Sequence, residues 1–584
     1  MRTFGELKKN IKSNKDRKGL RELSMALLGD TATQFLRTAL EGYGYELGYR
    51  TDIYESEYDV LESEIINAES GLYEKKRDFI VIYMSSERAY DMFTKLAVSE
   101  REGFADAYVS HIEGYWELIA ERSEARVIQF DLNRIISGVY GNYGNRLASA
   151  WEYQYRRLQY LLAEAASRRE GVYLMGLDDI QSRLGRKVFC DMRFYYDARM
   201  SIYTDALPEV AKSVFDIVEA ADGRVKKCLV LDLDNTLWGG VIGDDGIGGI
   251  ELGELGNGRI YCDIQRWCLE LKARGIILAV CSKNDEDTAK EPFEKHPDML
   301  LHLDDIAVFV ANWEDKAANI RYIRDVLNIG MDSMVFLDDS AFERNLVREM
   351  IPEITVPELP EESAEWLEYL GRLDIFDTAV GTAGGDRTEK YRQEAERRSA
   401  KKQYADVDEY LKSLQMKADC AAFDEFHYPR IAELSQRSNQ FNLRTVRYTE
   451  DQIRAIAEDD RYITLYFTLR DRFGDYGLVS CVIMERTSDR EAFIDTWFMG
   501  CRVLNRGMEE FIINSVAESA SQQGIEILTA EYIPTKKNKM VEDIYAGFGF
   551  EALGDGRYRL ETDKYVKKDT YIRETATGCF TSLR

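Results

Sequence analysis

Four short apolar runs in the middle of the chain each end abruptly in polar residues, and this pattern constrains the fold more than any other feature. The runs are KKCLVLDLD, GIILAVCSKND, IAVFVANW and SMVFLDDS, with helix-forming stretches between them. Strands that alternate with helices predict a parallel α/β sheet, and the polar residues that follow each strand gather at the carboxyl edge of such a sheet. We therefore expect a functional site at that edge.

The regions on either side of these runs predict two further folded parts. Before them, SMALLGD, DFIVIYMSS, ARVIQFDLN and GVYLMGLDD repeat the alternation of strand and helix, which favours a second parallel α/β sheet. After them, longer strands (RYITLYFTLRD, YGLVSCVIME, EAFIDTWFMG) precede a helix, MEEFIINSVAESASQQG, and a strand, IEILTAEYI, as in an α+β domain.

Length and composition agree with several ordinary globular domains. At about 150 residues per domain, 584 residues predict three or four units. We place an α/β domain at 1–222, a central α/β domain at 223–371, a charge-dense helical connector at 372–418 and an α+β domain at 419–584.

Charge and cysteine content exclude several functional classes. The 77 Lys and Arg residues against 104 Asp and Glu give a net charge of −27, which disfavours binding to nucleic acid or to an anionic membrane surface. Nine cysteines without a CxxC pair are typical neither of a disulfide framework nor of a zinc site. The sequence begins without a secretory apolar segment and contains no apolar run of the ~20 residues that span a membrane. We expect a cytoplasmic protein.

The segment Asp232-Leu-Asp234-Asn-Thr236, directly after the apolar run CLVL, carries the strongest chemical signal. One carboxylate of such a pair can attack phosphorus while the other transfers a proton to the leaving group. A phosphate dianion beside two carboxylates requires a cation, and oxygen ligands favour Mg²⁺. Asp338 and Asp339 follow the run MVFL and supply further carboxylates. The alternative for the first segment alone is a capped turn or a calcium-type loop.

Donors to a phosphoryl group are expected from the other two strand ends. Ser282 follows GIILAVC and Lys316 lies in WEDKAANI, and a hydroxyl and an ammonium can neutralise phosphoryl oxygens. We also assign Thr236 and Asn284 to the binding of phosphate or substrate.

These motifs, in this order, resemble those of the haloacid dehalogenase (HAD) superfamily of phosphoryl-transfer enzymes. The resemblance implies that Asp232 forms a phosphoaspartate, that Asp234 is the general acid/base, that Ser282 and Lys316 bind phosphate, and that Asp232, Asp234, Asp338 and Asp339 form the magnesium side of the site. Which of the last two carboxylates binds the metal directly stays open.

Longer strings make the resemblance more specific. DLDNTLWGGVIGDDGIGGIELG, CSKND, NWEDKAANI and VFLDDSAFERNLV are similar to the FkbH-like, subfamily IIIC branch, and RIAELSQRSNQFNLRTVRYTE extends the similarity over nearly the whole chain. Members of this branch dephosphorylate 1,3-bisphosphoglycerate and load the glyceryl group onto the phosphopantetheine thiol of an acyl carrier protein. Other members are phosphatases of surface-polysaccharide or secondary metabolism.

Two features near the motifs bear on the substrate. The stretch Gly239–Gly258 is too short for a cap domain, which leaves room for a carrier protein as well as for a small phosphorylated substrate. Cys281, next to Ser282, is either a buried packing residue or a thiol that accepts the acyl group before its transfer.

The N-terminal region resembles an SGNH-hydrolase fold through Gly29-Asp30-Thr31, Asn133 and Asp191. A hydrolase of that kind needs a nucleophilic serine and a histidine base. Thr31 stands at the nucleophile position and no histidine lies near Asp191, so we expect a non-catalytic scaffold that docks a partner or shapes the rim of the site.

The C-terminal region resembles the GNAT acetyltransferase fold, in which a loop before a helix holds the pyrophosphate of coenzyme A. The matching residues run from Arg502 to Gly507, but Asn505 replaces the first glycine, which argues against acetyl-CoA. Recognition of a phosphopantetheine arm, or a role in packing alone, remains open. Phe441, Trp497 and Phe498 are expected in the core. The basic run Lys536–Lys539 either meets an acidic carrier protein or is a solvated loop.

Three functions are compatible with the sequence. The first is an FkbH-like, Mg²⁺-dependent enzyme that cleaves phosphate and transfers a glyceryl group to a carrier thiol. The second is a phosphatase acting on a sugar phosphate or another small phosphate, and the third is a non-enzymatic binding scaffold.

Overall fold

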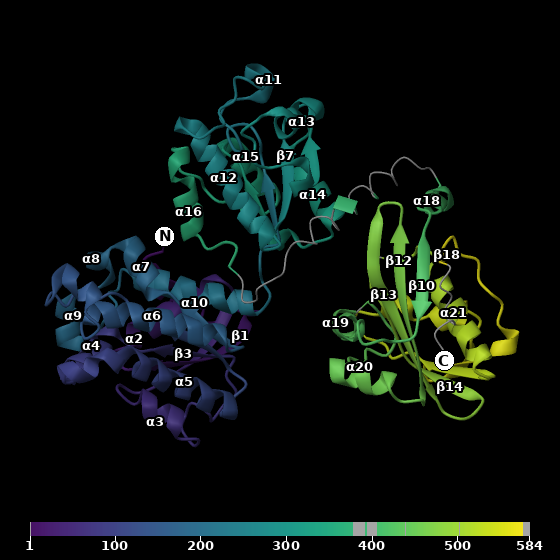
Figure 1. Ribbon diagram of the computed structural model, residues 1–584, viewed down its shortest axis with the longest axis horizontal. Helices are drawn as coiled ribbons and strands as arrows, with labels where there is room; N and C mark the ends of the chain where they lie inside the picture. The colour runs from purple at the N-terminus through teal and green to yellow at the C-terminus, as the bar shows by residue number, and fades with distance from the viewer. Residues whose placement is uncertain are drawn as a thin grey trace. The chain divides into compact units, whose positions relative to one another are not determined.

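The computed structural model describes residues 2–377, 392–393, 397, 406–438, 440–500, 503–535 and 537–575. The chain divides into two compact units: unit 1 is Met1–Lys227 with Leu359–Thr382, and unit 2 is Cys228–Glu358 with Ala383–Arg584. Figure 1 shows their helices and strands. Among the described residues, we find no helix with the length and apolar content needed to cross a membrane.

Unit 1 is built on a five-stranded parallel sheet with the strand order β2-β1-β3-β4-β5, as predicted for this region. Its strands are β1 Arg21–Gly29, β2 Tyr49–Glu55, β3 Phe79–Tyr83, β4 Arg126–Phe130 and β5 Val172–Met175. Its helices are α1 Phe4–Asn14, α2 Gln34–Glu46, α3 Leu61–Ile66, α4 Ser86–Lys95, α5 Phe104–Arg122, α6 Trp151–Ser167, α7 Leu177–Leu184, α8 Arg186–Phe189, α9 Met192–Ala198, α10 Leu207–Ala221 and α16 Trp366–Arg372.

Alternate residues of β3 enter two different cores of unit 1. Phe79 and Val81 pack in one apolar cluster, and Ile80 and Ile82 pack in another on the opposite face of the sheet. All five residues of β3 are buried, which explains why this strand reads as a continuous apolar run. Such a strand is easy to recognise from sequence.

The first part of unit 2 is a four-stranded parallel sheet with the order β8-β7-β6-β9, and its four strands are the four predicted ones. They are β6 Cys228–Leu231, β7 Ile277–Ser282, β8 Ile306–Ala311 and β9 Met334–Leu337. The helices are α11 Ile242–Asp245, α12 Gly256–Ala273, α13 Glu286–Lys295, α14 Lys316–Leu327 and α15 Ala341–Met350. Leu231 pairs with Val280 on one side and Leu337 on the other, so the carboxyl ends of β6, β7 and β9 are in register.

Three helices that follow these strands begin with a side-chain cap. Asp285, Asp315 and Ser340 accept hydrogen bonds from backbone N–H groups in the first turns of α13, α14 and α15. Such caps satisfy N–H groups that have no partner within the helix. They also fix the loops on which the candidate site residues lie.

The last part of unit 2 is a nine-stranded mixed sheet, which confirms the predicted α+β architecture. Its strands are β10 Lys417–Ala421, β11 Phe441–Asn442, β12 Tyr462–Asp471, β13 Gly474–Arg486, β14 Glu491–Met499, β15 Ile527–Glu531, β16 Glu551–Gly554, β17 Arg557–Glu561 and β18 Arg573–Glu574. Its helices are α18 Val407–Ser413, α19 Tyr428–Arg437, α20 Glu450–Ala457, α21 Met508–Gln522 and α22 Ile544–Gly547. Most of the predicted connector at 372–418 lies outside the described residues.

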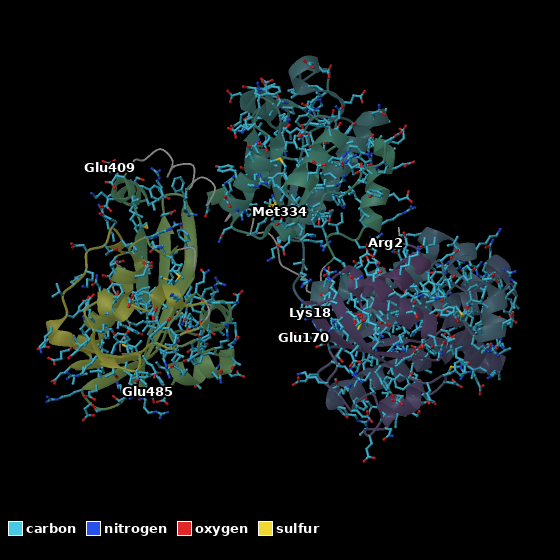
Figure 2. All side chains as sticks on the ribbon, turned by 180° about the vertical axis from the view of Figure 1, so that it is seen from behind. Arg2, Lys18, Glu170, Met334, Glu409 and Glu485 are labelled. Atoms are coloured by element: carbon cyan, nitrogen blue, oxygen red, sulfur yellow. The ribbon has the colours of Figure 1, made fainter. Side chains whose placement is uncertain are left out.

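Charged and apolar side chains separate as expected for globular units. Lys18 and Glu170 are exposed on unit 1, whereas Met334, the first residue of β9, is fully buried (Figure 2). The predicted core aromatics Phe441, Trp497 and Phe498 are buried, which confirms that prediction.

Candidate active site

The predicted site residues of unit 2 lie on loops at one edge of the four-stranded sheet. Asp232 follows β6, Ser282 ends β7, Lys316 is the first residue of α14 after β8, and Asp338 follows β9. Because all four strands are parallel, their carboxyl ends meet at this edge. The sheet therefore brings together residues that are more than 100 positions apart in the sequence.

A buried lysine links two of the carboxylates. Nζ of Lys316 donates a hydrogen bond to Oδ2 of Asp338 at 2.6 Å and lies 3.0 Å from Oδ2 of Asp232. All three side chains are buried. Burial by itself lowers the pKa of Lys316, but the charges of Asp232 and Asp338 outweigh it and raise that pKa above its usual value. The lysine is therefore a permanent cation in this site.

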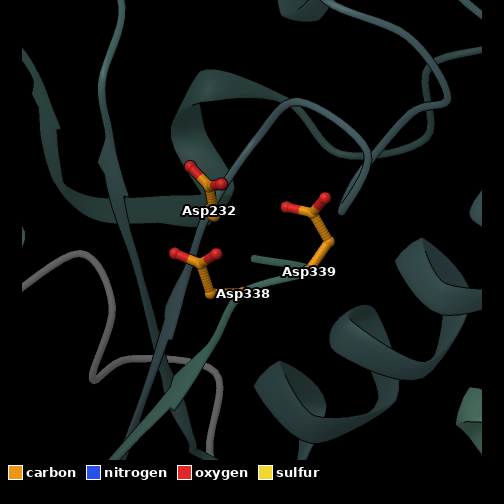
Figure 3. A group of neighbouring side chains, drawn as sticks. All are labelled: Asp232, Asp338 and Asp339. Carbon is orange, nitrogen blue, oxygen red and sulfur yellow. The ribbon is translucent and has the colours of Figure 1, made fainter. Parts of the chain in front are cut away.

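Asp339 completes a group of three carboxylates. One oxygen each of Asp232, Asp338 and Asp339 lie within 4.8 Å of one another, and Figure 3 shows the three side chains around one small volume. Burial, followed by the charge of Asp232, raises the pKa of both Asp338 and Asp339. One ammonium thus faces three carboxylates, which leaves an excess of negative charge.

This arrangement fits a divalent cation with oxygen ligands. Oδ1 of Asp232 is buried and has no hydrogen-bond partner among the residues that the structure describes, although an orphaned carboxylate oxygen is costly to bury. A small, hard cation such as Mg²⁺ is coordinated by carboxylate oxygens and would compensate the surplus charge. Asp232, Asp338 and Asp339 are the residues that would hold it.

Asp234 lies outside this group of three carboxylates. Its Oδ1 accepts hydrogen bonds from the indole of Trp238 and the N–H of Ile242, both at 2.9 Å, and its Oδ2 accepts one from Asn284 at 3.0 Å. Burial raises the pKa of Asp234, which favours a carboxyl group that can carry a proton. Its role as general acid/base and its role as a metal ligand both stay predictions.

The other predicted binding residues have structural partners in the same loops. The hydroxyl of Thr236 is buried and accepts a hydrogen bond from the N–H of Asp339 at 3.3 Å, so it ties the loop after β6 to the loop after β9. Asn284 orients Asp234, and Ser282 is buried at the end of β7. Phosphate binding by Thr236, Ser282 and Asn284 stays a prediction.

Sequence reasoning missed two residues that support the site. Trp238 donates to Asp234, and Arg344 donates to the backbone carbonyls of Asp338 (2.9 Å) and Asp339 (2.6 Å). Both are buried. The spacing of four residues between Asp234 and Trp238 is a weak sequence signal for their hydrogen bond. Arg344 lies on a charged helix, and no sequence signal indicates its contacts with Asp338 and Asp339.

Cys281 lies under the site rather than at its surface. Its side chain is fully buried, its Sγ is 3.7 Å from the carbonyl oxygen of Lys316, and burial raises the pKa of the thiol. A reactive cysteine needs a lowered pKa and an accessible sulfur. These surroundings favour the packing role over the acyl-accepting role, which stays a prediction.

The stretch after the first motif forms a small flap. Residues 239–258 contain the single turn α11, a bridge between Gly239 and Glu251, and the start of α12. Asn235, at a φ of 53°, turns the chain into this flap, and its side chain accepts a hydrogen bond from Gly240 N–H at 2.9 Å. The stretch therefore holds no separate cap domain.

The candidate residues of the flanking regions are placed differently. The hydroxyl of Thr31 donates to the carbonyl of Arg199 and is buried, which agrees with a non-catalytic role. Gly507, at a φ of 82°, precedes α21, and the N–H of Asn505 donates to the carboxylate of Glu509 at 2.9 Å. Arg502 and Lys536 lie outside the described residues. Binding of phosphopantetheine or acetyl-CoA there is untested.

The parallel sheet and the carboxylate site define a phosphatase of the HAD type, and comparison with known proteins gives its family. The model of the FkbH N-terminal domain matches residues 24–219. The crystal structure of the N-terminal part of BF1531 from Bacteroides fragilis, which contains a phosphatase domain complexed with Mg, is 43% identical to this chain and covers 65% of it. All of that structure is matched, with a TM-score of 0.62. The chain therefore belongs to the FkbH-like family of HAD phosphatases.

Other comparisons gave weaker matches or none. The ribosomal-protein-S18-alanine N-acetyltransferase from Escherichia coli is 15% identical and matches 25% of this chain and 94% of its own length, with a TM-score of 0.20. The GNAT domain of S. lividans PAT is 14% identical and matches 25% of this chain and 89% of its own length, also with a TM-score of 0.20. No curated protein matches the chain.

Proposed function

We propose that the chain is a Mg²⁺-dependent enzyme that removes a phosphoryl group from 1,3-bisphosphoglycerate or a similar phosphate and passes the glyceryl group to an acyl carrier protein thiol. The observation that carries the phosphoryl chemistry is the contact of Lys316 with Asp232 and Asp338 beside the orphaned oxygen of Asp232. The BF1531 structure, which is complexed with Mg, supports the choice of metal.

The residues of this chain have distinct tasks in the proposed reaction. Asp232 attacks the phosphorus of the phosphomonoester, and the P–O bond to the leaving alcohol breaks. Asp234 donates a proton to that oxygen and then accepts one from the water that hydrolyses the phosphoaspartate. Lys316 contacts Asp232 and neutralises phosphoryl oxygens. A bound Mg²⁺ would stabilise the negative charge of the phosphoryl group.

The acyl phosphate at the other end of 1,3-bisphosphoglycerate supplies the activation for transfer. Attack of the carrier thiol on its carbonyl carbon breaks the C–O bond to phosphate and forms a thioester, while the thiol proton leaves with the phosphate. No oxidant or further co-substrate is needed. The small flap at residues 239–258 supports this proposal, because access by a pantetheine arm requires a site without a cap domain.

The experiment compares wild type with Asp232→Asn and with Asp287→Asn, an exposed carboxylate on α13 that serves as the matched control. Each protein is incubated with 1,3-bisphosphoglycerate, a holo acyl carrier protein and Mg²⁺ or EDTA, and the carrier is weighed intact. We expect a glyceryl adduct and phosphate release with wild type and Asp287→Asn. With Asp232→Asn or EDTA we expect no phosphate release from the phosphomonoester above that of an enzyme-free blank. Phosphate without an adduct would instead assign a plain phosphatase.

A further inference from the structure

One surface of unit 1 combines exposed aromatic residues with positive charge. It is formed by residues 134–146, after β4, and residues 186–199, after β5, and we call it the Tyr/Arg face. Because β4 and β5 are adjacent parallel strands, the first segment and α7, which precedes the second segment, leave the sheet at the same edge. Arg199, at the end of the second segment, bonds at this same edge to Ala32 in the loop after β1. Figure 1 shows α7, α8 and α9 gathered at one side of unit 1.

The face exposes large apolar side chains that an isolated protein would bury. Tyr143 is 62% exposed, Val139 68% and Tyr196 72%. Seven of the 26 exposed large apolar side chains of the described residues lie in these 27 positions, which is far more than their share of the chain: Ile136, Val139, Tyr140, Tyr143, Val188, Phe194 and Tyr196. A concentration of exposed apolar groups marks an interaction surface.

The charge of the face is opposite to that of the molecule. The two segments contain six cationic and two anionic side chains, whereas the whole chain has a net charge of −27. One of the two anions, Asp191, is already paired with Arg193. Arg134, Arg146 and Lys187 form no ion pair within the described part of the chain. These cations are available to a partner.

The backbone that carries these side chains is anchored to the sheet. The N–H of Arg134 donates to Gln181 at 3.0 Å, and the carbonyl of Arg199 accepts a hydrogen bond from the N–H of Ala32 at 3.0 Å. Asp131 accepts a hydrogen bond from the N–H of Leu177 at 2.6 Å, which joins the end of β4 to the start of α7, the helix before the second segment. A preorganised surface loses little entropy on binding.

We propose that the Tyr/Arg face docks the acidic carrier protein, an inference that rests on the proposed function. Tyrosine and arginine are the residues that dominate protein interfaces, and a local positive field steers an acidic partner toward a chain that repels it elsewhere. A compact acidic domain fits this face better than a nucleic acid, because an extended polyanion would also meet the rest of a chain whose net charge is −27.

The test uses the full chain and three forms of it. One variant carries Arg134→Glu, Arg146→Glu and Lys187→Glu, and another carries Tyr143→Ala and Tyr196→Ala. The matched control, Lys9→Glu, Lys12→Glu and Lys18→Glu, makes the same change of charge with exposed residues of α1 and the loop after it. The probe is a holo acyl carrier protein, measured by calorimetric titration at low and high salt.

We expect the dissociation constant to rise at least tenfold in both face variants and less than twofold in the control, with higher salt weakening binding to wild type. Hydrolysis of a small phosphomonoester should be unchanged in all forms, which shows that unit 2 is intact, and an unchanged unfolding temperature excludes misfolding of unit 1 as the cause. Equal binding or loading of the carrier by the face variants would overturn the docking surface and leave the proposed function standing. If wild type neither binds nor loads the carrier, both fail. If wild type binds an RNA oligonucleotide and not the carrier, and the face variants lose this binding, the Tyr/Arg face is assigned to nucleic acid and the proposal is overturned.

Discussion

Nζ of Lys316 lies 2.6 Å from Oδ2 of Asp338, a carboxylate with no solvent exposure. The same ammonium lies 3.0 Å from Asp232, so one buried cation compensates two buried anions. The energetic consequence is asymmetric, because removal of one partner from a buried ion pair costs more than the pair contributes.

Lys316→Met should therefore destabilise the metal-free protein by about 3–5 kcal/mol, the usual cost of leaving a buried charge uncompensated. Phosphate release should fall by a factor of about 10²–10³ through loss of a charge-stabilising donor. Mg²⁺ should restore part of the stability, since a cation beside the carboxylates replaces the lost charge. Thermal unfolding with Mg²⁺ or EDTA measures these effects.

The control for Lys316 is Lys295→Met, which removes a lysine that pairs with Glu291 on the surface of α13. Exposed pairs contribute at most about 1 kcal/mol, so this variant should resemble wild type. A metal-free Lys316→Met protein as stable as Lys295→Met would contradict the importance of the buried contact.

Trp238→Phe should slow catalysis without unfolding the site. The indole donates to Asp234 at 2.9 Å, and its ring also packs edge-on against Phe293, a contact that phenylalanine can keep. Loss of a hydrogen bond to a charged group costs about 1.5 kcal/mol, which corresponds to about tenfold in kcat. Steady-state kinetics with a small phosphomonoester should show this decrease with little change in KM.

Trp366→Phe is the matched control for Trp238, because Trp366 is also buried and its indole donates to the carbonyl of Pro360 at 2.8 Å. Its kcat should equal that of wild type. Equal kcat for both tryptophan variants would mean that Asp234 needs no orientation by the indole.

The part of the site that sequence predicts is the part that directly follows apolar strands. Asp232 and Asp338 come immediately after four-residue buried strands, so their position at the sheet edge follows from the pattern alone. Arg344 could not be found in this way, because it acts through backbone carbonyls and its surroundings on α15 are those of an ordinary charged helix. The group that accepts from a buried donor is determined by tertiary packing, and this packing cannot be inferred from a single sequence.

Burial likewise explains which strands of unit 1 could be predicted from the sequence. The central strand β3 is buried throughout and was predicted, whereas the edge strand β2 has mixed burial and a polar sequence, YRTDIYE, and was missed. Residue type alone also does not determine whether an aromatic side chain is buried. Trp497 lies in the core as expected, but nothing in the residue types reveals that Tyr143 and Tyr196 are exposed. Their exposure depends on what packs over the loops after β4 and β5.

Arg344→Met should weaken metal binding more than it weakens the fold. The guanidinium is buried and holds the carbonyls of Asp338 and Asp339, so its loss leaves two acceptors unsatisfied at a cost of about 1–3 kcal/mol. Residues that orient metal ligands typically contribute about 10–100-fold to metal affinity. The Mg²⁺ concentration for half-maximal phosphate release should rise by that factor.

Arg321→Met is the control for Arg344. Arg321 donates to the carbonyl of Met350 at 2.7 Å but is exposed, so water can replace it. The Arg321→Met variant should require the same Mg²⁺ concentration as wild type for half-maximal phosphate release. If the Arg344 variant requires no more Mg²⁺ than the Arg321 variant, Arg344 does not position the carboxylates.

Asp30 gives unit 1 a predicted dependence on pH. Burial raises the pKa of this carboxyl to about 7, although it accepts a hydrogen bond from the N–H of Ser85 at 2.8 Å. Because its pKa is higher in the folded than in the unfolded chain, the folded state holds the proton more tightly. Its contribution is complete below about pH 4, and up to about 1.4 kcal/mol is lost for each pH unit as the pH rises toward 7.

Asp30→Asn should remove this dependence, since the amide oxygen can still accept from Ser85 and no charge is buried. The variant should match wild type near pH 4 and unfold at a higher temperature at pH 8, as followed by scanning calorimetry of the full chain. Asp16→Asn, an exposed carboxylate in the loop after α1, should follow wild type at both pH values. A lower unfolding temperature for Asp30→Asn at pH 8 would mean that the ionised carboxylate stabilises the loop after β1 and that burial does not dominate its pKa.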